Sequence, residues 1–234
     1  MHGVTDDEVR RLVPAVDYSE ALTITASEAD VREACRAAKR YGCRAVVAFP
    51  QYLPVMVEEL TDSGVLAQIP VGFPCGGHTT RVKSAEAEEG LKAGATDLDM
   101  MMNLGAFKAG DYRRVSDDIA AVMAVARPFG VPFKVIIETG ALTDDEKVTA
   151  SKLVLNSGAD FVKTCTGFGP GRATVHDIAL LRETVGDRAG IKASGGVASI
   201  EDGVAFMRAG ATVVAMRRML IDQLEAMAWP QRLA

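Results

Sequence analysis

Short apolar runs alternate with longer amphipathic segments from one end of the chain to the other, and the short runs are rich in Val, Ile and Phe. Such runs predict buried strands, and the segments between them predict helices, so repeated βα units on a parallel sheet are expected. Eight strands are expected, at residues 12–17, 44–49, 66–72, 96–103, 133–138, 161–164, 190–193 and 212–215.

Helix boundaries are also visible between the expected strands. Four segments begin with a Ser or Thr that has an acidic residue three positions later, the pattern of a capped N-terminus: Ser27, Thr143, Thr174 and Ser199. Three glycines stand where a helix would finish in a left-handed turn: Gly94, Gly158 and Gly210. The chain therefore repeats one architectural unit.

Eight βα units favour a closed barrel over an open sheet. Open doubly wound sheets more often have five or six strands and a G-x-G-x-x-G motif after the first, and no such motif follows Asp17. At 234 residues the chain is close to the roughly 250 that one α/β barrel typically uses. We expect an α/β fold with a single domain, residues 1–234, forming a (β/α)8 TIM barrel.

Composition and charge narrow the classes of partner. With 26 Lys and Arg against 31 Asp and Glu, the net charge is −5, and no basic patch indicates nucleic acid or an anionic membrane. No apolar run approaches the about 18 residues of a transmembrane helix. The start of the chain lacks signal-peptide features and the four cysteines lack C-x-x-C spacing, so a reduced cytoplasmic protein is expected.

Polar side chains at the ends of the expected strands are the candidates for chemistry, because barrels place active sites at the C-terminal ends of their strands. They are Asp17, Asp97, Asp99, Asn103, Lys134, Glu138, Lys163 and Lys192. An ammonium group inside a barrel is either paired with an acid, extended to one end of the strand, or kept as a neutral amine for chemistry.

A neutral lysine suggests a Schiff-base enzyme, in which the amine attacks an aldehyde or ketone and the iminium accepts electrons. Free lysine has a pKa near 10.4 and must be shifted downward to react at neutral pH. The sixth and seventh strands are neighbours in a barrel. Lys163 and Lys192 are therefore expected to lie side by side, where the charge on one would keep the other neutral, and an acid such as Asp99 could relay protons.

Structural roles are the alternative for the same residues. The lysines would then pair with Asp97, Asp99 and Glu138 in a polar layer that closes the barrel, and a scaffolding salt bridge is the expected role of Lys134 and Glu138. Asp17 is either a hydrogen-bonding residue of the barrel end or a substrate contact. No metal site is expected, because Cys75 and His78 form a lone C-x-x-H without a second pair of ligands.

Glycine-rich turns follow the sixth and seventh strands, at residues 166–171 and 194–196. Their backbone N–H groups suit an anion, and the loops after strands seven and eight often bind phosphate in barrels, although any tight βα turn uses glycine. Arg217 and Arg218 either add positive charge to this corner or form the solvated first turn of the last helix.

Several motifs resemble the deoxyribose-phosphate aldolase family. The segments at residues 158–168 and 190–196, which carry Lys163 and Lys192, are similar to its two signature segments. Further similar motifs stand at residues 97–100 with Asn103, at 71–74 with Thr79 and Thr80, and at 134–140. The resemblance covers roughly residues 44 to 214.

The resemblance implies a (β/α)8 class I aldolase that cleaves 2-deoxyribose 5-phosphate to acetaldehyde and glyceraldehyde 3-phosphate without a metal or other cofactor. It implies a small phosphosugar or aldehyde as the partner, and often a homodimer. It makes Lys163 the Schiff-base lysine, Lys192 the cation that lowers its pKa and Asp99 the proton relay. Around the substrate and its phosphate it places Thr166, Gly167, Gly195, Gly196 and, at a substrate hydroxyl, Asp17.

The chain departs from the family pattern in three places. Tyr18-Ser19-Glu20 follows Asp17 where the family has His or Leu and then Thr, and Val47 replaces a cysteine. The eighth strand ends in Ala-Met-Arg217-Arg218 where the family has Gly-Thr-Ser-Ser, whose serines help to hold the phosphate. Two guanidinium groups would replace those donors or select a carboxylate instead, so a rebuilt anion pocket is expected.

Three other functions stay open beside this aldolase. The first is a paralogous Schiff-base aldolase that acts on another aldehyde acceptor, either non-phosphorylated or carboxylated. The second is a barrel isomerase that uses carboxylates such as Asp99 and Glu138. The third is a catalytically silent barrel.

Overall fold

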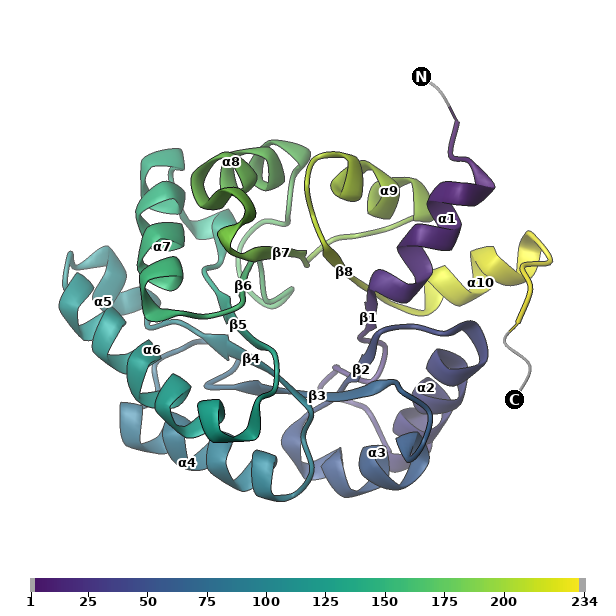
Figure 1. The fold of residues 1–234 in the computed structure, drawn as a ribbon, viewed down its shortest axis with the longest axis horizontal. Helices are drawn as coiled ribbons and strands as arrows, with labels where there is room; N and C mark the ends of the chain where they lie inside the picture. Colours follow the sequence, from purple (N-terminus) through teal and green to yellow (C-terminus); the bar gives the residue numbers. More distant parts are fainter. Residues whose placement is uncertain (1–2, 232–234) are drawn as a thin grey trace.

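The computed structural model describes residues 3–231, and within them eight parallel strands close into one barrel in the order β1 to β8. The helices surround this barrel on the outside (Figure 1). The expected (β/α)8 fold is confirmed. The strands are β1 Val16–Tyr18, β2 Ala45–Val47, β3 Leu66–Val71, β4 Asp97–Met101, β5 Phe133–Ile136, β6 Phe161–Lys163, β7 Gly190–Ala193 and β8 Val213–Met216.

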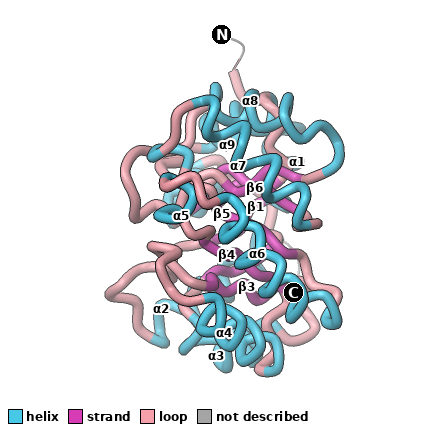
Figure 2. The backbone as a smooth tube through the Cα atoms, turned by 90° about the vertical axis from the view of Figure 1, so that its left-hand side faces the viewer, coloured by secondary structure: helices cyan, strands magenta, loops and turns pink. Residues whose placement is uncertain are grey.

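The helices cover the strands on both sides when the barrel is seen from the side (Figure 2). None within residues 3–231 has the length and apolar character needed to cross a membrane. Their bounds are α1 Asp6–Leu12, α2 Glu28–Tyr41, α3 Leu53–Leu60, α4 Thr80–Lys92, α5 Leu104–Lys108, α6 Tyr112–Ala126, α7 Asp144–Ser157, α8 Val175–Val185, α9 Ile200–Arg208 and α10 Arg218–Ala226.

The expected helix boundaries are confirmed. The side chains of all four expected N-caps accept a hydrogen bond from the backbone N–H three residues later: Ser27, Thr143, Thr174 and Ser199. All three expected glycines have a positive φ after their helices: Gly94, Gly158 and Gly210.

The first strand was expected too early in the chain. Leu12 is the last residue of α1, residues 13–15 form a 3-10 helix, and β1 begins only at Val16. Val9 and Leu12 are buried on one face of α1, and Pro14 suits the start of a helical turn. Apolar residues of this short helix therefore looked like the beginning of the strand.

The interior of the barrel contains a layer of charged side chains. Along β4, Asp97 and Asp99 face the axis while Leu98 and Met100 pack in the core against the helices, as strand alternation requires. The ladders pair Asp99 with Lys134 and Lys163 with Lys192. Branched apolar side chains usually fill this space in such barrels, so the polar layer calls for a chemical explanation.

Candidate active site

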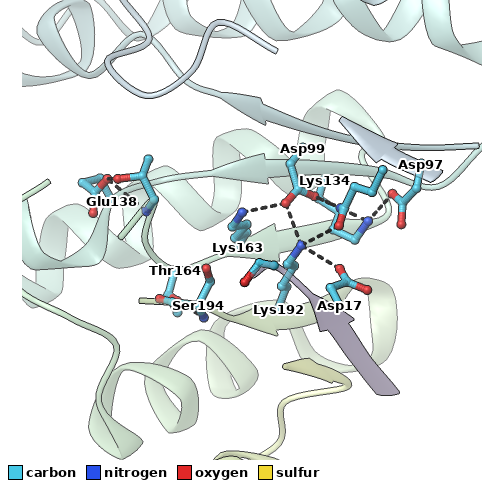
Figure 3. A network of polar contacts seen from close by, with 12 residues as sticks. Asp17, Asp97, Asp99, Lys134, Glu138, Lys163, Thr164, Lys192 and Ser194 are labelled. Atoms are coloured by element: carbon cyan, nitrogen blue, oxygen red, sulfur yellow. Dashed lines mark hydrogen bonds and ion pairs between the residues drawn. The ribbon is translucent and has the colours of Figure 1, made fainter. Parts of the chain in front are cut away.

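Asp99 is the centre of a buried ion-pair network (Figure 3). Its Oδ2 accepts hydrogen bonds from Lys163 Nζ at 2.6 Å and from Lys192 Nζ at 2.7 Å. Lys192 Nζ also lies 2.6 Å from Oδ2 of Asp17. The structure therefore brings together the three residues that the sequence marks as catalytic candidates.

The two lysines titrate differently although they share Asp99. Burial is the largest influence on Lys163 and lowers its pKa to about 8, with Asp99 opposing this shift and Lys192 adding to it. The Lys192 charge thus contributes as expected, but burial contributes more. Burial also acts on Lys192, where Asp17 and Asp99 together outweigh it and raise the pKa. Lys163 is the amine that loses its proton first.

Asp99 is a carboxylate in the resting protein. Burial favours its protonated form, but Lys163, Lys192 and Lys134 outweigh burial and hold the pKa of Asp99 below its usual range. In this state Asp99 accepts a proton but has none to give. This is compatible with the relay role expected for it.

A second part of the network lies deeper in the barrel. Lys134 Nζ pairs with Asp97 and lies 3.5 Å from Oδ1 of Asp99. Gln68 donates to Asp99 and accepts from Lys192 Nζ at 3.0 Å. Gln68 was not among the predicted site residues, although an amide in the middle of the apolar strand expected at residues 66–72 is a visible signal.

Arg44 was missed as well. Its NH1 lies 2.6 Å from Oδ1 of Asp17 and 2.7 Å from Oδ2 of Asp97. Burial raises the pKa of Asp97, while Lys134 and Arg44 on its two oxygens oppose that shift. Arg44 opens the second expected strand, where a basic residue gave no sign that it turns inward.

The scaffolding salt bridge expected of Lys134 and Glu138 is present for Lys134 and absent for Glu138 among residues 3–231. Lys134 pairs with Asp97 and Asp99, and Glu138 lies beyond the end of β5 with a left-handed φ of 57°. Strand alternation has stopped there, so Glu138 does not share a face with Lys134. Its Oε2 instead accepts from Thr166 N at 3.1 Å and from Thr166 Oγ1 at 2.6 Å.

The turns after β6 and β7 present open backbone donors. The hydroxyl of Thr166 accepts from the N–H groups of Phe168 and Gly169, which fixes the first turn. Gly167, Gly195 and Gly196 have φ values of 83°, 93° and 76°, a region that disfavours any other residue. Among the described residues, none of these three backbone N–H groups has a hydrogen-bond partner.

A cavity of about 270 Å³ opens between these turns and the lysines. Asp17 and Asp99 are fully buried beneath this cavity. Asp17 was expected either to be a hydrogen-bonding residue of the barrel end or to contact the substrate, and the structure places it in the ion-pair network inside the barrel. The lining of the cavity includes Lys163, Lys192, Thr166, Gly167, Ser194, Gly195, Gly196 and Arg217.

The two arginines after β8 have different surroundings. Arg217 lines the cavity, and its NH2 donates to the carbonyl of Leu22 at 3.2 Å. Arg218 is in the first turn of α10, where its backbone N–H donates to Glu20 at 2.8 Å and its Nε to Asp222 at 2.9 Å. Of these two arginines, Arg218 therefore belongs to the solvated first turn of α10, and Arg217 is the one that adds positive charge to the cavity.

With the site assembled, comparison with known proteins identifies its family. A family model described as DeoC/LacD family aldolase matches residues 11–219. The chain belongs to this aldolase family.

Several known aldolases are similar to this chain over most of its length. The deoxyribose-phosphate aldolase 2 of Oceanobacillus iheyensis is 43% identical over 205 residues, which is 88% of this chain and 91% of that protein. The Micrococcus luteus deoxyribose-phosphate aldolase is 43% identical over 90% of this chain and 93% of its own. A putative deoxyribose-phosphate aldolase structure from Coccidioides immitis superposes with a TM-score of 0.85 at 32% identity, covering 92% of this chain and 84% of the other.

Aromatic side chains cross part of the mouth of the aldolase barrel. Phe168, after β6, contacts Phe73, after β3, with ring centroids 5.2 Å apart and planes at 85°. Phe73 in turn lies 6.2 Å from Phe49, after β2. Because β3 and β6 are not neighbours in the barrel, this contact links loops from two separate parts of the mouth.

Proposed function

We propose that this aldolase reversibly cleaves 2-deoxy-D-ribose 5-phosphate to acetaldehyde and D-glyceraldehyde 3-phosphate through a Schiff base on Lys163. One observation carries the proposal: Lys163 Nζ reaches the cavity from a buried position that lowers its pKa to about 8, beside a second lysine that keeps its charge. Relatives named deoxyribose-phosphate aldolase at 43% identity support the substrate.

The chemistry begins with the neutral amine of Lys163. Nζ attacks C1 of the open-chain aldehyde, and loss of the carbonyl oxygen as water leaves an iminium. The C3 hydroxyl then gives up its proton, and the C2–C3 bond breaks. Its electrons form an enamine, and C3 leaves as the aldehyde of the three-carbon product. Protonation at C2 and hydrolysis release acetaldehyde and restore the amine.

Proton acceptance is assigned to Asp99 acting through Lys192. Lys192 lines the cavity, and its Nζ is 2.7 Å from Asp99 Oδ2, so a proton moves between cavity and carboxylate over one short contact. Asp17, at 2.6 Å, holds the same ammonium in place. In this mechanism Asp17 reaches the substrate only through Lys192.

The phosphate is assigned to the opposite end of the cavity. The open N–H groups of Gly167, Gly195 and Gly196 would donate hydrogen bonds to its oxygens, and Arg217 would supply a guanidinium fork that matches them. Thr166 holds the first of these turns through three hydrogen bonds. Arg218 takes no part.

A second candidate rests on Arg217 itself. A guanidinium group binds a carboxylate as readily as a phosphate, so a paralogous aldolase with a carboxylated acceptor aldehyde fits the same cavity. Initial rates with phosphorylated, carboxylated and uncharged acceptor aldehydes separate the two. The phosphorylated acceptor is expected to give the highest kcat/KM, and preference for the carboxylated one would favour the paralogue.

Trapping tests the nucleophile. Acetaldehyde with borohydride is expected to leave one ethyl group on the peptide that contains Lys163, and none in a Lys163→Met variant. Cleavage activity retained by that variant would overturn the Schiff-base proposal, and activity that also survives Lys192→Met would favour the carboxylate isomerase. A folded wild-type protein with neither adduct nor turnover would be the silent barrel.

Assembly and location stay predictions. We expect a cytoplasmic homodimer, whereas the deoxyribose phosphate aldolase of Aeropyrum pernix is described as a tetramer; its structure has a TM-score of 0.86 at 28% identity and covers 94% of this chain and 96% of its own. Sedimentation equilibrium across a range of protein concentrations would give the mass of the assembly directly.

A further inference from the structure

Six charged side chains form a closed ring beneath the cavity, which we call the charge ring. In order around it the members are Asp17, Lys192, Asp99, Lys134, Asp97, Arg44 and Asp17 again. Acid and base alternate at every step. Figure 3 labels Asp17, Asp97, Asp99, Lys134 and Lys192, with Lys134 between Asp99 and Asp97, and Lys192 between Asp99 and Asp17.

The charge ring is balanced without Lys163. With Asp97 ionised between Arg44 and Lys134, which bind both of its oxygens and oppose the effect of burial on its pKa, the three carboxylates and three cations of the ring cancel. Within residues 3–231, Lys163 attaches to the ring from outside, through Asp99 alone. Because the side chains of five members are fully buried, a change of one charge in the ring acts on Lys163 with little screening by water.

Arg44 closes the ring at the end far from the cavity. It reaches from the position just before β2 to Asp17 on β1 and to Asp97 on β4, and its guanidinium carbon lies 5.9 Å from the ring centroid of Phe161 on β6. The Arg44 side chain is 16% exposed and does not line the cavity. Any effect it has on the reaction must therefore pass through the other ring members.

We propose that Arg44 is a positioning residue of this aldolase, whose charge closes the ring and thereby leaves Lys163 as the unbalanced cation that gives up its proton. The inference rests on the proposed Schiff-base function. Without Arg44 the ring carries one net negative charge, which holds the proton on Lys163. Without the carboxylate of Asp97 it carries one net positive charge, which expels that proton.

The other charged groups around Lys163 do not change this balance. Asp99 on β4 and Lys192 on β7 face it directly, and Asp17 on β1 acts on it from further away. From the loops, Arg217 lines the same cavity and Glu138 is bound to Thr166. Arg217 and Glu138 lie outside the ring and keep their charges when Arg44 or Asp97 is substituted, so a shift of the Lys163 titration is transmitted by the ring members Asp17, Asp99 and Lys192.

Arg44→Gln, Asp97→Asn and the double variant test the proposal. The pH dependence of kcat/KM and of borohydride trapping with acetaldehyde would be measured for each. Arg44→Gln is expected to move the acid limb of both profiles upward by about one pH unit, and Asp97→Asn to move it downward. The double variant restores a balanced ring and is expected to return the limb toward the wild-type position.

Arg44→Lys keeps the positive charge, so the acid limb of both pH profiles is expected to stay at the wild-type position. The different shape of the lysine side chain can still lower kcat. A structural role alone would lower kcat in both single variants without moving their limbs in opposite directions. Limbs that stay fixed, or that move together, would overturn the proposal. If Arg44→Gln does not fold, the direction of the Asp97→Asn shift still decides. Absence of trapping in the wild-type protein would instead refute the Schiff-base function.

Discussion

Lys163 and Lys192 donate to the same oxygen of Asp99, at 2.6 and 2.7 Å, yet their pKa values shift in opposite directions. The difference lies in their second partner. Lys192 has the carboxylate of Asp17 at 2.6 Å, while the other neighbour of Lys163 is the cavity. Among the described residues, Lys163 is thus paired with one carboxylate and Lys192 with two, and the lysine with one carboxylate is the nucleophile.

Activity is expected to rise with pH through about 8. The reaction needs the neutral amine, and the pKa of Lys163 in the free enzyme is about 8, so the acid limb of kcat/KM falls there. Lys192→Met removes a repelling cation and should move this limb to higher pH, whereas Lys192→Arg keeps the charge. Initial rates across the pH range measure both, and a downward shift in Lys192→Met would contradict the assignment.

Stability should separate the nucleophile from the scaffold. At pH 7, Lys163→Met removes an unbalanced buried cation, and we expect the free energy of unfolding to stay the same or rise. Lys134→Met leaves Asp97 and Asp99 undercompensated and should cost about 3–5 kcal/mol. Urea unfolding gives both values. A larger loss in Lys163→Met would mean that its pair with Asp99 serves the fold.

The same lysine should make stability depend on pH. The pKa of Lys163 is about 8 when folded and near its ordinary value of 10.5 when unfolded, so between these values the unfolded chain binds more protons. Stability contributed by this group therefore rises as pH increases from 8 to 10.5. Urea unfolding at several pH values should show the rise in wild type relative to Lys163→Met, and parallel curves would refute it.

Arg217 and Arg218 form a matched pair. Arg217→Ser should raise KM for the phosphorylated substrate by about 10- to 100-fold, with a smaller change in kcat, because a charged hydrogen bond contributes about 1.5–3 kcal/mol. Arg218→Ser loses only an exposed i,i+4 pair and should change KM less than about 2-fold. Steady-state kinetics distinguishes them, and equal effects would remove Arg217 from the anion site.

The hydroxyl of Thr166 is expected to matter more than its methyl group. Thr166→Val removes a donor to Glu138 and the acceptor for two backbone N–H groups, and should raise KM and cost about 1–3 kcal/mol of stability. Thr166→Ser keeps the hydroxyl and should stay near wild type in both. Kinetics and thermal unfolding of the two variants would show it, and a Ser variant as impaired as Val would point to packing.

Much of this molecule follows from local patterns. Strand-length apolar runs, capping pairs and glycine stops predicted the barrel, and lysines inside predicted strands marked the chemistry. Residues 12–15 were wrongly predicted as part of the first strand, because a short apolar run fits a helix face as well as a strand. The positions of the Arg44 and Glu138 side chains could not be predicted, because they are set by contacts with residues far away in the sequence. The sequence also could not show which of Arg217 and Arg218 lines the cavity.

The charge ring also bears on how this barrel responds to heat. The penalty for dehydrating charged groups falls as temperature rises, whereas stabilisation by apolar burial reaches a plateau. An ionic centre inside an apolar shell of helices therefore gains relative strength on warming. The outer layer of the barrel should loosen before the strands that hold Lys163, so the nucleophile keeps its geometry close to the temperature at which the fold is lost.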